Sequence, residues 1–357
     1  MLSENYLHNF KTNHIFHMTD DTGMLQHSIY GVPQLSEGYT SDDNARALIM
    51  AVMLFEKTKE KKVESLIYKY TSFLCYAQNS NGTFRNFMGY NREFLEKEGS
   101  EDCFGRCLWA LCYAYSNPST PRNIKITVWA LIENALQNCT KLTYPRAKAY
   151  AIIGLRYLNT KKTNGLIAEL ASSLAKQYDK FKEDEWHWFE DSMAYCNSVF
   201  PLAMLNSYEA TKDDLYKHIG YESLGFLESK TFRNGYFKPI GCKGWLSKGK
   251  AAAEFDEQPV EACEMTLAYL KAYKLSGKYI FLGKARTCFS WYRGLNSKNL
   301  SLVDTETGGC YDGITANGLN LNQGAESVVS FWIAYLEIEK YSGEKKQKTL
   351  IKTVSLR

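Results

Sequence analysis

Acidic residues stand directly before apolar, helix-like stretches at five places along this chain. These places carry Asp42 and Asp43, Glu101 and Asp102, Glu190 and Asp191, Asp256 and Glu257, and Glu326. Carboxyl groups brought together can divide acid–base work, because one gives a proton while another takes one from water. A carboxylate at a helix start also has a structural use, since it can cap free N–H groups and suits the positive end of the helix dipole.

The first of these stretches, from Gly38 to Glu56, shows how the local pattern is built. Ser41 or Asp42 can cap a helix, because a short side-chain oxygen accepts hydrogen bonds from the first turn. Apolar residues then recur at helical spacing as far as Phe55. The stretch therefore predicts a helix with an acidic start.

The same pattern recurs and predicts a ring of helical hairpins. Apolar helices are expected to begin near residues 42, 101, 145, 190, 257 and 326, and one further amphipathic helix fits between each two neighbouring starts. These further helices are expected over 61–78, 121–139, 165–181, 213–229 and 279–295. Six hairpins that close on themselves form an all-α (α/α)6 toroid. An open superhelical array is the alternative, but the starts are spaced less regularly than in such arrays.

In a toroid the inner helices all start at one end, so their first turns surround one cleft. Five of the six expected starts carry acids, and the third carries Arg146 instead. We expect a single domain over 1–357, with an N-terminal extension over 1–35 and a tail over 342–357. The long loops 79–100, 230–256 and 296–322 are expected at the cleft rim, where they would set specificity.

Composition limits the classes of partner. Hydrophobic residues make up 45% of the chain and charged residues 23%, which is typical of a soluble globular protein. A net charge of +4 is too small to indicate nucleic-acid binding, and the sequence shows neither a signal peptide nor a stretch long enough to span a membrane. Ten scattered cysteines without a CxxC motif predict reduced thiols in the cytoplasm. His14 and His17 have ligand-like spacing without nearby partners, so we expect no metal site.

Several of the acid-bearing motifs resemble those of one family. "GYTSDDNARAL", "GSEDCFGRCLWAL", "WFEDSMAYCNSVFPLAML", "FDEQPVEA" and "NQGAES" are similar to the bacterial six-hairpin glycosidase-like proteins, which often accompany or are fused to glycosyltransferases. The resemblance covers roughly residues 15–341 and implies an (α/α)6 toroid with a carbohydrate ligand. The chain departs from the family motif after "FEDS", where Cys196 stands in place of an aspartate.

Two carboxyl groups across the cleft suit glycoside hydrolysis with inversion, in which they lie about 6.5–9.5 Å apart. We expect Glu326 to act as the base and Asp191, beside two tryptophans that would raise its pKa, as the acid, with Asp102 as the second choice for the acid. The remaining residues of the predicted sugar site are polar or aromatic and stand near the helix starts: Tyr39, Asp42, Asp43, Arg46, Glu101, Arg106, Trp188, Glu190, Asn197, Trp245, Asp256, Glu257, Tyr311 and Gln323.

Three other functions stay open on the same fold. A sugar 2-epimerase would typically use paired histidines, and His187 is well placed but has no second histidine on a late inner helix. A phosphorylase would need a phosphate pocket, for which Arg46, Arg106 and Arg146 are candidates. A glycan-binding partner of a glycosyltransferase would use the acids only as caps and as ligands for sugar hydroxyls.

Overall fold

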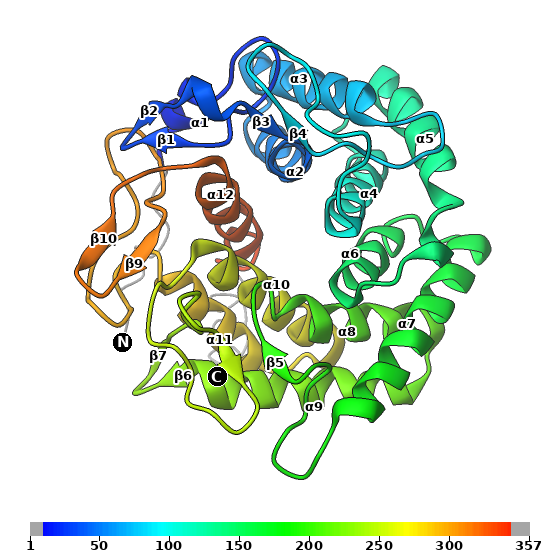
Figure 1. Cartoon of the computed structure of the whole chain (residues 1–357), viewed down its shortest axis with the longest axis vertical. Coiled ribbons are helices and arrows are strands. Elements are labelled where there is room, and N and C mark those ends of the chain that lie inside the picture. The colour runs from blue at the N-terminus through cyan, green and yellow to red at the C-terminus, as the bar shows by residue number, and fades with distance from the viewer. Residues whose placement is uncertain (1–9, 344–357) are drawn as a thin grey trace, which may run out of the picture.

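The computed structural model describes residues 10–343 and confirms the predicted (α/α)6 toroid. Six inner helices follow one another around the ring (Figure 1). They are α2 (Ser41–Thr58), α4 (Glu101–Ser116), α6 (Pro145–Leu155), α8 (Val199–Thr211), α10 (Pro259–Ser276) and α12 (Ala325–Glu339). Helix α12 packs against α2, which closes the ring.

Outer helices cover the ring and alternate with the inner helices along the chain. They are α3 (Lys61–Ala77), α5 (Arg122–Leu136), α7 (Lys161–Phe181), α9 (Asp214–Thr231) and α11 (Tyr279–Ser290). The N-terminal segment with the short helix α1 (Asn13–His17) lies against α12, where Phe10 contacts Phe331 and Tyr335 edge-to-face. Among residues 10–343, this segment takes the place that a sixth outer helix would fill.

Inner helices can pack closely where glycine replaces a larger side chain. A Cβ on Gly105 of α4 would lie 2.8 Å from the carbonyl oxygen of Ala147, and one on Gly154 of α6 would lie 2.6 Å from the Cα of Trp109. Both distances are too short for a real side chain. The close approach of α4 and α6 therefore depends on these two glycines.

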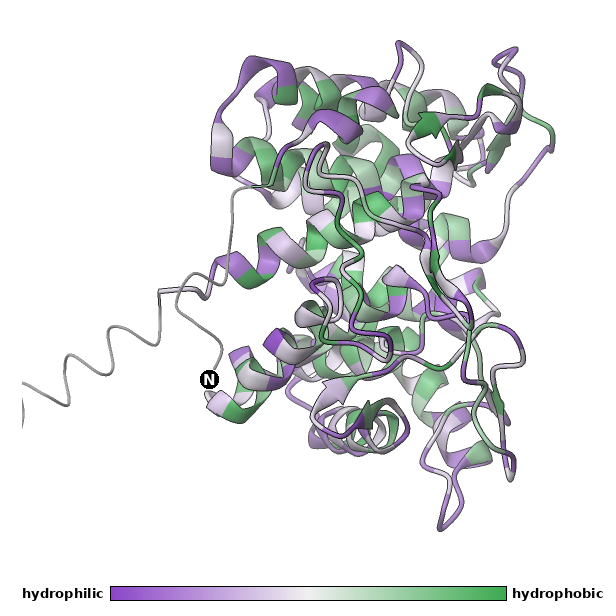
Figure 2. Ribbon diagram, turned by 90° about the vertical axis from the view of Figure 1, so that its left-hand side faces the viewer, coloured by the Kyte–Doolittle hydropathy of each residue, from purple (hydrophilic) through white to green (hydrophobic). Residues whose placement is uncertain are grey.

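Short antiparallel strand pairs occupy the loops at one end of the barrel (Figures 1 and 2). The pairs are β1 (Ser28–Ile29) with β2 (Val32–Pro33), β3 (Tyr39–Thr40) with β4 (Phe87–Met88), β5 (Ser192–Met193) with β8 (Leu246–Ser247), β6 (Phe232–Arg233) with β7 (Tyr236–Phe237), and β9 (Gly313–Thr315) with β10 (Gly318–Asn320). Strand β3 runs directly into α2, so this is the end at which the inner helices start.

The starts of the inner helices differ from the sequence prediction in two ways. The N-cap of α2 is Thr40, not Ser41 or Asp42, and its hydroxyl accepts the backbone N–H of Asp43. The fourth inner helix begins at Val199 rather than near residue 190, because β5 and a turn occupy the preceding residues. Pro201 falls in its first turn, where a missing N–H costs nothing.

The core fills the space between the two layers of helices. Its largest fully buried side chains include Trp188, Trp291 and Trp332. All ten cysteines are free, as the sequence predicted. Within residues 10–343, no helix is both long and apolar enough to cross a membrane. The predicted tail lies almost entirely outside the described residues, as do the first nine residues of the predicted extension.

Candidate functional site

One connected network of charged and polar side chains lies where the inner helices start. Arg46 of α2 is 4% exposed and donates hydrogen bonds to two carboxylates, with a third, that of Asp42, at 3.6 Å. Its Nη2 donates to Asp43 Oδ1 at 2.9 Å, and its Nη1 donates to Glu326 Oε2 at 3.0 Å. One guanidinium therefore joins the first turn of α2 to the first turn of α12, across the closure of the ring.

A second arginine extends the network to the next two hairpins. Arg106 of α4 donates to Asp42 Oδ2 at 2.6 Å and to the Tyr150 hydroxyl at 3.1 Å, and its Nη2 lies 3.2 Å from Cys196 Sγ. The Tyr150 hydroxyl on α6 in turn donates to Glu264 Oε1 at 2.6 Å. The position at which this chain has cysteine in place of an aspartate therefore faces a guanidinium.

Two glutamates of α10 complete the network below the rim. Glu261 accepts the backbone N–H groups of Cys196 and Asn197, which fixes the turn before α8. Burial raises the pKa of Glu264 to about 7, and burial together with the charge of Glu264 raises the pKa of Glu261 to about 8. Burial likewise raises the pKa of Asp43 to about 6, against the opposing charge of Arg46.

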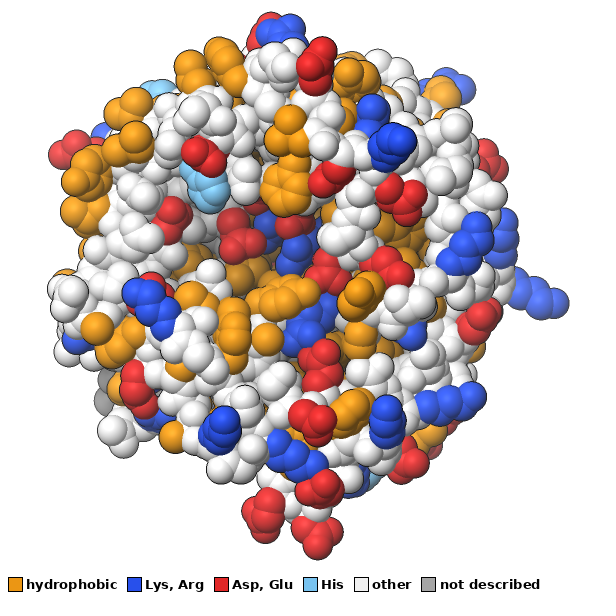
Figure 3. Space-filling model, in the orientation of Figure 1, with side chains coloured by type: hydrophobic (Ala, Val, Ile, Leu, Met, Phe, Trp, Pro, Cys, Tyr) orange, Lys and Arg blue, Asp and Glu red, His pale blue; other side chains and the backbone are white. Residues whose placement is uncertain are grey.

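We call these linked side chains the central network. It takes at least one member from every inner hairpin: Asp42, Asp43, Arg46, Arg106, Tyr150, Cys196, Glu261, Glu264 and Glu326. The space-filling view shows a hollow at the middle of this face, with acidic, basic and apolar side chains inside it (Figure 3). A ligand in the hollow would meet residues that are hundreds of positions apart in sequence.

A smaller group lies beside the central network. The Tyr195 hydroxyl donates to Asp102 Oδ2 at 2.7 Å, and the Tyr195 carbonyl accepts Arg146 Nε at 2.7 Å. Arg146 also donates to Glu190 Oε2 at 2.7 Å. Asp102 and Glu190, both predicted site residues, are therefore joined through one arginine and one tyrosine.

Asp312, in the loop before β9, lies next to the start of α12. Its Oδ1 accepts the backbone N–H of Gly324 at 2.7 Å and the Ser327 hydroxyl at 2.6 Å. Burial raises the pKa of Asp312, and the charge of Glu326 adds to this effect. The side chain stays partly exposed, so this carboxyl combines access with a raised pKa.

The surroundings of Asp191 differ from the sequence prediction. Asp191 is solvent-exposed, and helix α8 starts eight residues after it, so it does not cap that helix. Trp188 is fully buried and packs on Phe189 and Phe200 in the core, while Trp186 donates its indole N–H to the Glu190 carbonyl. The aromatic wall expected to raise the pKa of Asp191 therefore belongs to the core.

Three more predicted residues have structural partners outside the central network. Tyr39 is 1% exposed and donates its hydroxyl to Asp20. Glu101 accepts the backbone N–H groups of residues 143 and 144, which anchors the loop before α6. Glu257 is fully buried, precedes α10, and accepts the Trp291 indole N–H at 2.7 Å.

The remaining predicted residues lie on the surrounding loops. Asp256 pairs with Lys243 at 3.2 Å, and Trp245 and Tyr311 are partly exposed. Asn197 is buried in the turn before α8, where its amide N–H donates to a backbone carbonyl. The backbone N–H of Gln323 donates to the Ser28 hydroxyl at 2.8 Å, and Gln323 is buried.

Five of the residues described above were not predicted as site residues from the sequence. They are Tyr150, Tyr195, Glu261, Glu264 and Asp312. A signal was present for the glutamates, which stand three residues apart and therefore on one face of an otherwise apolar helix. Buried carboxylates at such spacing indicate a polar interior, not a solvated face.

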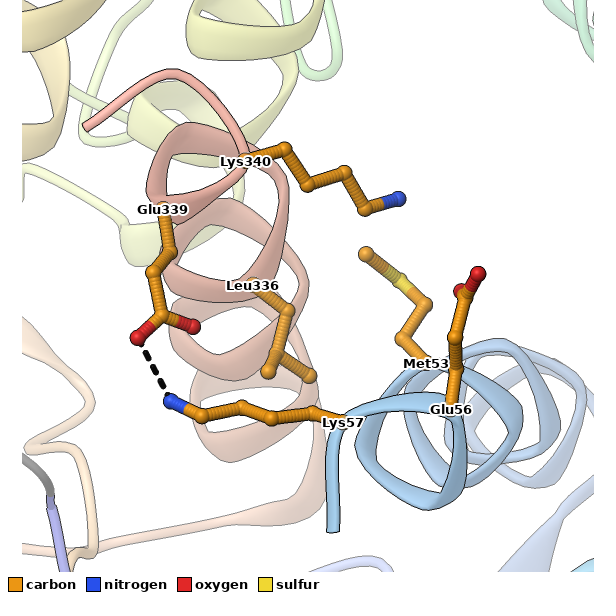
Figure 4. Close-up of a pocket in the computed structure, with 6 residues that line it drawn as sticks. All are labelled: Met53, Glu56, Lys57, Leu336, Glu339 and Lys340. Carbon is orange, nitrogen blue, oxygen red and sulfur yellow. Dashed lines mark hydrogen bonds and ion pairs between the residues drawn. The ribbon is translucent and has the colours of Figure 1, made fainter. Parts of the chain in front are cut away.

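Two further features bear on ligands. Among residues 10–343, no group of three or more His, Cys, Asp or Glu side chains is arranged to hold a metal ion. A pocket of about 470 Å³ lies between α2 and α12, lined by apolar Met53 and Leu336 and by charged side chains (Figure 4). Lys57 and Glu339 form an ion pair of 2.6 Å on it. It lies in the last turns of both helices, at the end opposite the central network.

Comparison with solved structures supports the fold. The chain resembles a sugar epimerase from a ruminal bacterium, with 12% identity, a TM-score of 0.69, and coverage of 94% of this chain and 97% of the other. It also resembles a cellobiose 2-epimerase from Bacillus thermoamylovorans, with 12% identity, a TM-score of 0.70, and coverage of 93% of this chain and 97% of the other. A third similar structure is a GH76 α-mannanase from Bacteroides thetaiotaomicron, with 11% identity, a TM-score of 0.62, and coverage of 87% of this chain and 89% of the other. No protein-family model and no curated protein sequence matches the chain.

Proposed function

We propose that this protein is a glycoside hydrolase that cleaves an oligosaccharide with two carboxyl groups of the central hollow. The observation that carries the proposal is the central network itself, which brings carboxylates from α2, α10 and α12 to the starts of the inner helices. Structures with this fold include enzymes named for action on cellobiose and mannan, which supports a carbohydrate as the substrate.

Glu326 is our candidate for the base. Its side chain is 40% exposed, which is more than that of either other carboxylate paired with Arg46. A water molecule can therefore reach it. Glu326 Oε2 forms an ion pair with Arg46 Nη1 at 3.0 Å, which holds the carboxylate at the start of α12. The sequence alone also favoured this residue.

The acid must carry a proton near neutral pH and reach the glycosidic oxygen. Asp312 is our candidate for the acid, because burial raises its pKa while the side chain remains partly exposed beside α12. Asp102 stays a candidate from the sequence, and its Oδ2 accepts a hydrogen bond from the Tyr195 hydroxyl. Asp191 is the third candidate, and its exposed position makes it the one that the geometry supports least.

The contacts of the central network favour hydrolysis over the other two reactions. A phosphorylase needs a cation for phosphate, whereas Arg46, Arg106 and Arg146 are each paired with a carboxylate. For a histidine-dependent epimerase the sequence offered His187, but His187 and His218 both lie against Glu222 of α9, on the outer layer. His27 is the histidine whose charge acts on Asp312, where it lowers the pKa of that carboxyl.

The test is an activity screen on neutral oligosaccharides of glucose and mannose, followed by NMR. Hydrolysis releases a new reducing end, and inversion gives the opposite anomer first. Epimerisation changes the sugar without cleavage, and phosphorolysis requires added phosphate. A change of sugar without cleavage would overturn the hydrolase proposal. Tight binding without turnover would favour the alternative of a glycan-binding partner of a glycosyltransferase.

A further inference from the structure

Tyr195 is unusual because it is exposed and yet held in place at several points. Its side chain and backbone together are 40% exposed. The hydroxyl donates to Asp102 at 2.7 Å, and the Arg146 guanidinium lies 4.6 Å from the ring centroid. An exposed tyrosine on a surface normally rotates freely, whereas this ring has a fixed orientation.

The backbone that carries Tyr195 is fixed as well. Cys196, the next residue, has a φ of +51°, in the left-handed region that non-glycine residues rarely adopt. The buried carboxylate of Glu261 accepts the backbone N–H groups of Cys196 and Asn197, which holds this turn against α10. A buried group inside the ring thus determines where the Tyr195 ring lies.

We propose that Tyr195 is a stacking platform for a pyranose ring of the substrate, an inference that rests on the proposed function and specifies its substrate class. A flat aromatic ring presents an apolar face that matches the C–H face of a sugar. Because the ring is already ordered, little conformational entropy is lost when the sugar binds.

The charges around Tyr195 indicate that this sugar is uncharged. Arg46, Arg106 and Arg146 are each ion-paired with a carboxylate, so an anionic ligand would have to compete with that carboxylate for each arginine. The nearby acids outnumber these three arginines even without Glu261, Glu264 and Asp312, whose pKa values are raised. The acids that remain are Asp42, Asp43, Asp102, Glu190 and Glu326. Phosphorylated sugars and uronic acids would therefore be repelled.

The chain offers a matched control for this inference. Tyr68 on the outer helix α3 is 41% exposed, and its hydroxyl is hydrogen-bonded to Asn123 at 3.0 Å. It equals Tyr195 in exposure and in hydroxyl bonding but lies on the outer layer. Comparing Tyr68→Ala with Tyr195→Ala therefore separates the effect of losing any exposed tyrosine ring from the effect of losing the ring proposed to bind the sugar.

The experiment is isothermal titration of the full-length protein with cellobiose, mannobiose, glucose, glucose 6-phosphate and glucuronate. We expect Tyr195→Ala to weaken binding of the neutral disaccharide about 5- to 10-fold, which is the range of an aromatic contact. Tyr195→Phe keeps the flat ring but loses the hydroxyl bond to Asp102, so it should bind more tightly than Tyr195→Ala, and Tyr68→Ala should stay within about 2-fold of the wild type. If Tyr195→Ala does not fold, Tyr195→Leu removes the flat face while keeping bulk.

Each outcome decides the inference separately from the hydrolase proposal. Equal affinity in Tyr195→Ala and Tyr68→Ala would overturn the platform and leave hydrolysis to its own assay. Tighter binding of glucose 6-phosphate than of glucose would overturn the charge selectivity. Sugar binding that depends on Tyr195 without any turnover would overturn the hydrolase while the platform stands. No binding to any of these sugars would overturn both.

Discussion

Replacing Glu264 by glutamine should change how the stability of the protein depends on pH. Glu264 is 4% exposed, and burial raises its pKa from an ordinary 4.5 to about 7. Between these two pH values the folded protein holds a proton that the unfolded chain has lost. The contribution of this group is therefore complete below about pH 4.5 and is lost as pH rises through 7.

The pKa values set the size of the effect. A difference between 4.5 and about 7 corresponds to roughly 3 kcal/mol of unfolding free energy over the whole window. Glutamine does not titrate, and its amide oxygen can still accept the Tyr150 hydroxyl. We therefore expect the wild type to lose stability relative to Glu264→Gln as pH rises, by up to about 3 kcal/mol between pH 4 and 8.

Urea denaturation at half-unit pH steps measures this difference directly. Glu261→Gln serves as a companion, because the pKa of Glu261 is raised to about 8. Its difference from the wild type should continue to grow between pH 7 and 8, where that of Glu264→Gln levels off. Wild-type and Glu264→Gln stabilities that run parallel from pH 4 to 8 would refute the reasoning that burial dominates at this carboxyl.

Two further predictions concern the charge network and the thiols. Arg106→Met should lower the unfolding free energy at pH 7 by about 3–5 kcal/mol, because it removes the 2.6 Å ion pair with Asp42 and leaves that carboxylate only the longer 3.6 Å contact with Arg46. The conservative Arg106→Lys, measured by the same denaturation curves, should recover part of the loss, and equal losses in both variants would contradict the ion-pair explanation. All ten cysteines should react with a thiol reagent in denaturant without prior reduction, since all are free in the structure. Eight or fewer reactive thiols per chain would contradict this prediction.

The fold was predictable because its signals are local. Apolar residues at helical spacing and polar helix starts recur along the chain, and only a closed ring or an open array satisfies six such hairpins. The start of α8 was wrong because an acidic pair was given more weight than Pro201, which fits only the first turn of a helix. A strand of two residues, β5, gives no pattern long enough to detect.

The candidate site was predictable only in part, because a side chain's direction depends on tertiary packing. Asp42, Arg46, Arg106 and Glu326 were named from the sequence and meet in the central network. Glu257 has the same local signature and instead binds Trp291 in the core. Composition and spacing at a helix start cannot separate these two cases, since each depends on residues far away in sequence.

The buried members were missed for a related reason. Tyr150, Glu261 and Glu264 stand inside helices that are apolar nearly all round, where a polar residue is easily attributed to a solvated face. Only the closed ring shows that these faces meet at the axis. Tyr195 carries no local signal, because its fixed position comes from Asp102 and Glu261 on two other hairpins.

The most direct test of the central claim is the turnover of Glu326→Gln on the oligosaccharide that the screen identifies. Glu339→Gln, on the same helix but paired with Lys57 at the opposite end, is the matched control. The account predicts that Glu326→Gln folds normally, binds the sugar, and loses turnover by about 10²-fold or more, while Glu339→Gln retains it. Full turnover in Glu326→Gln would contradict the claim that Glu326, a carboxylate of the central network, acts as the base of the reaction.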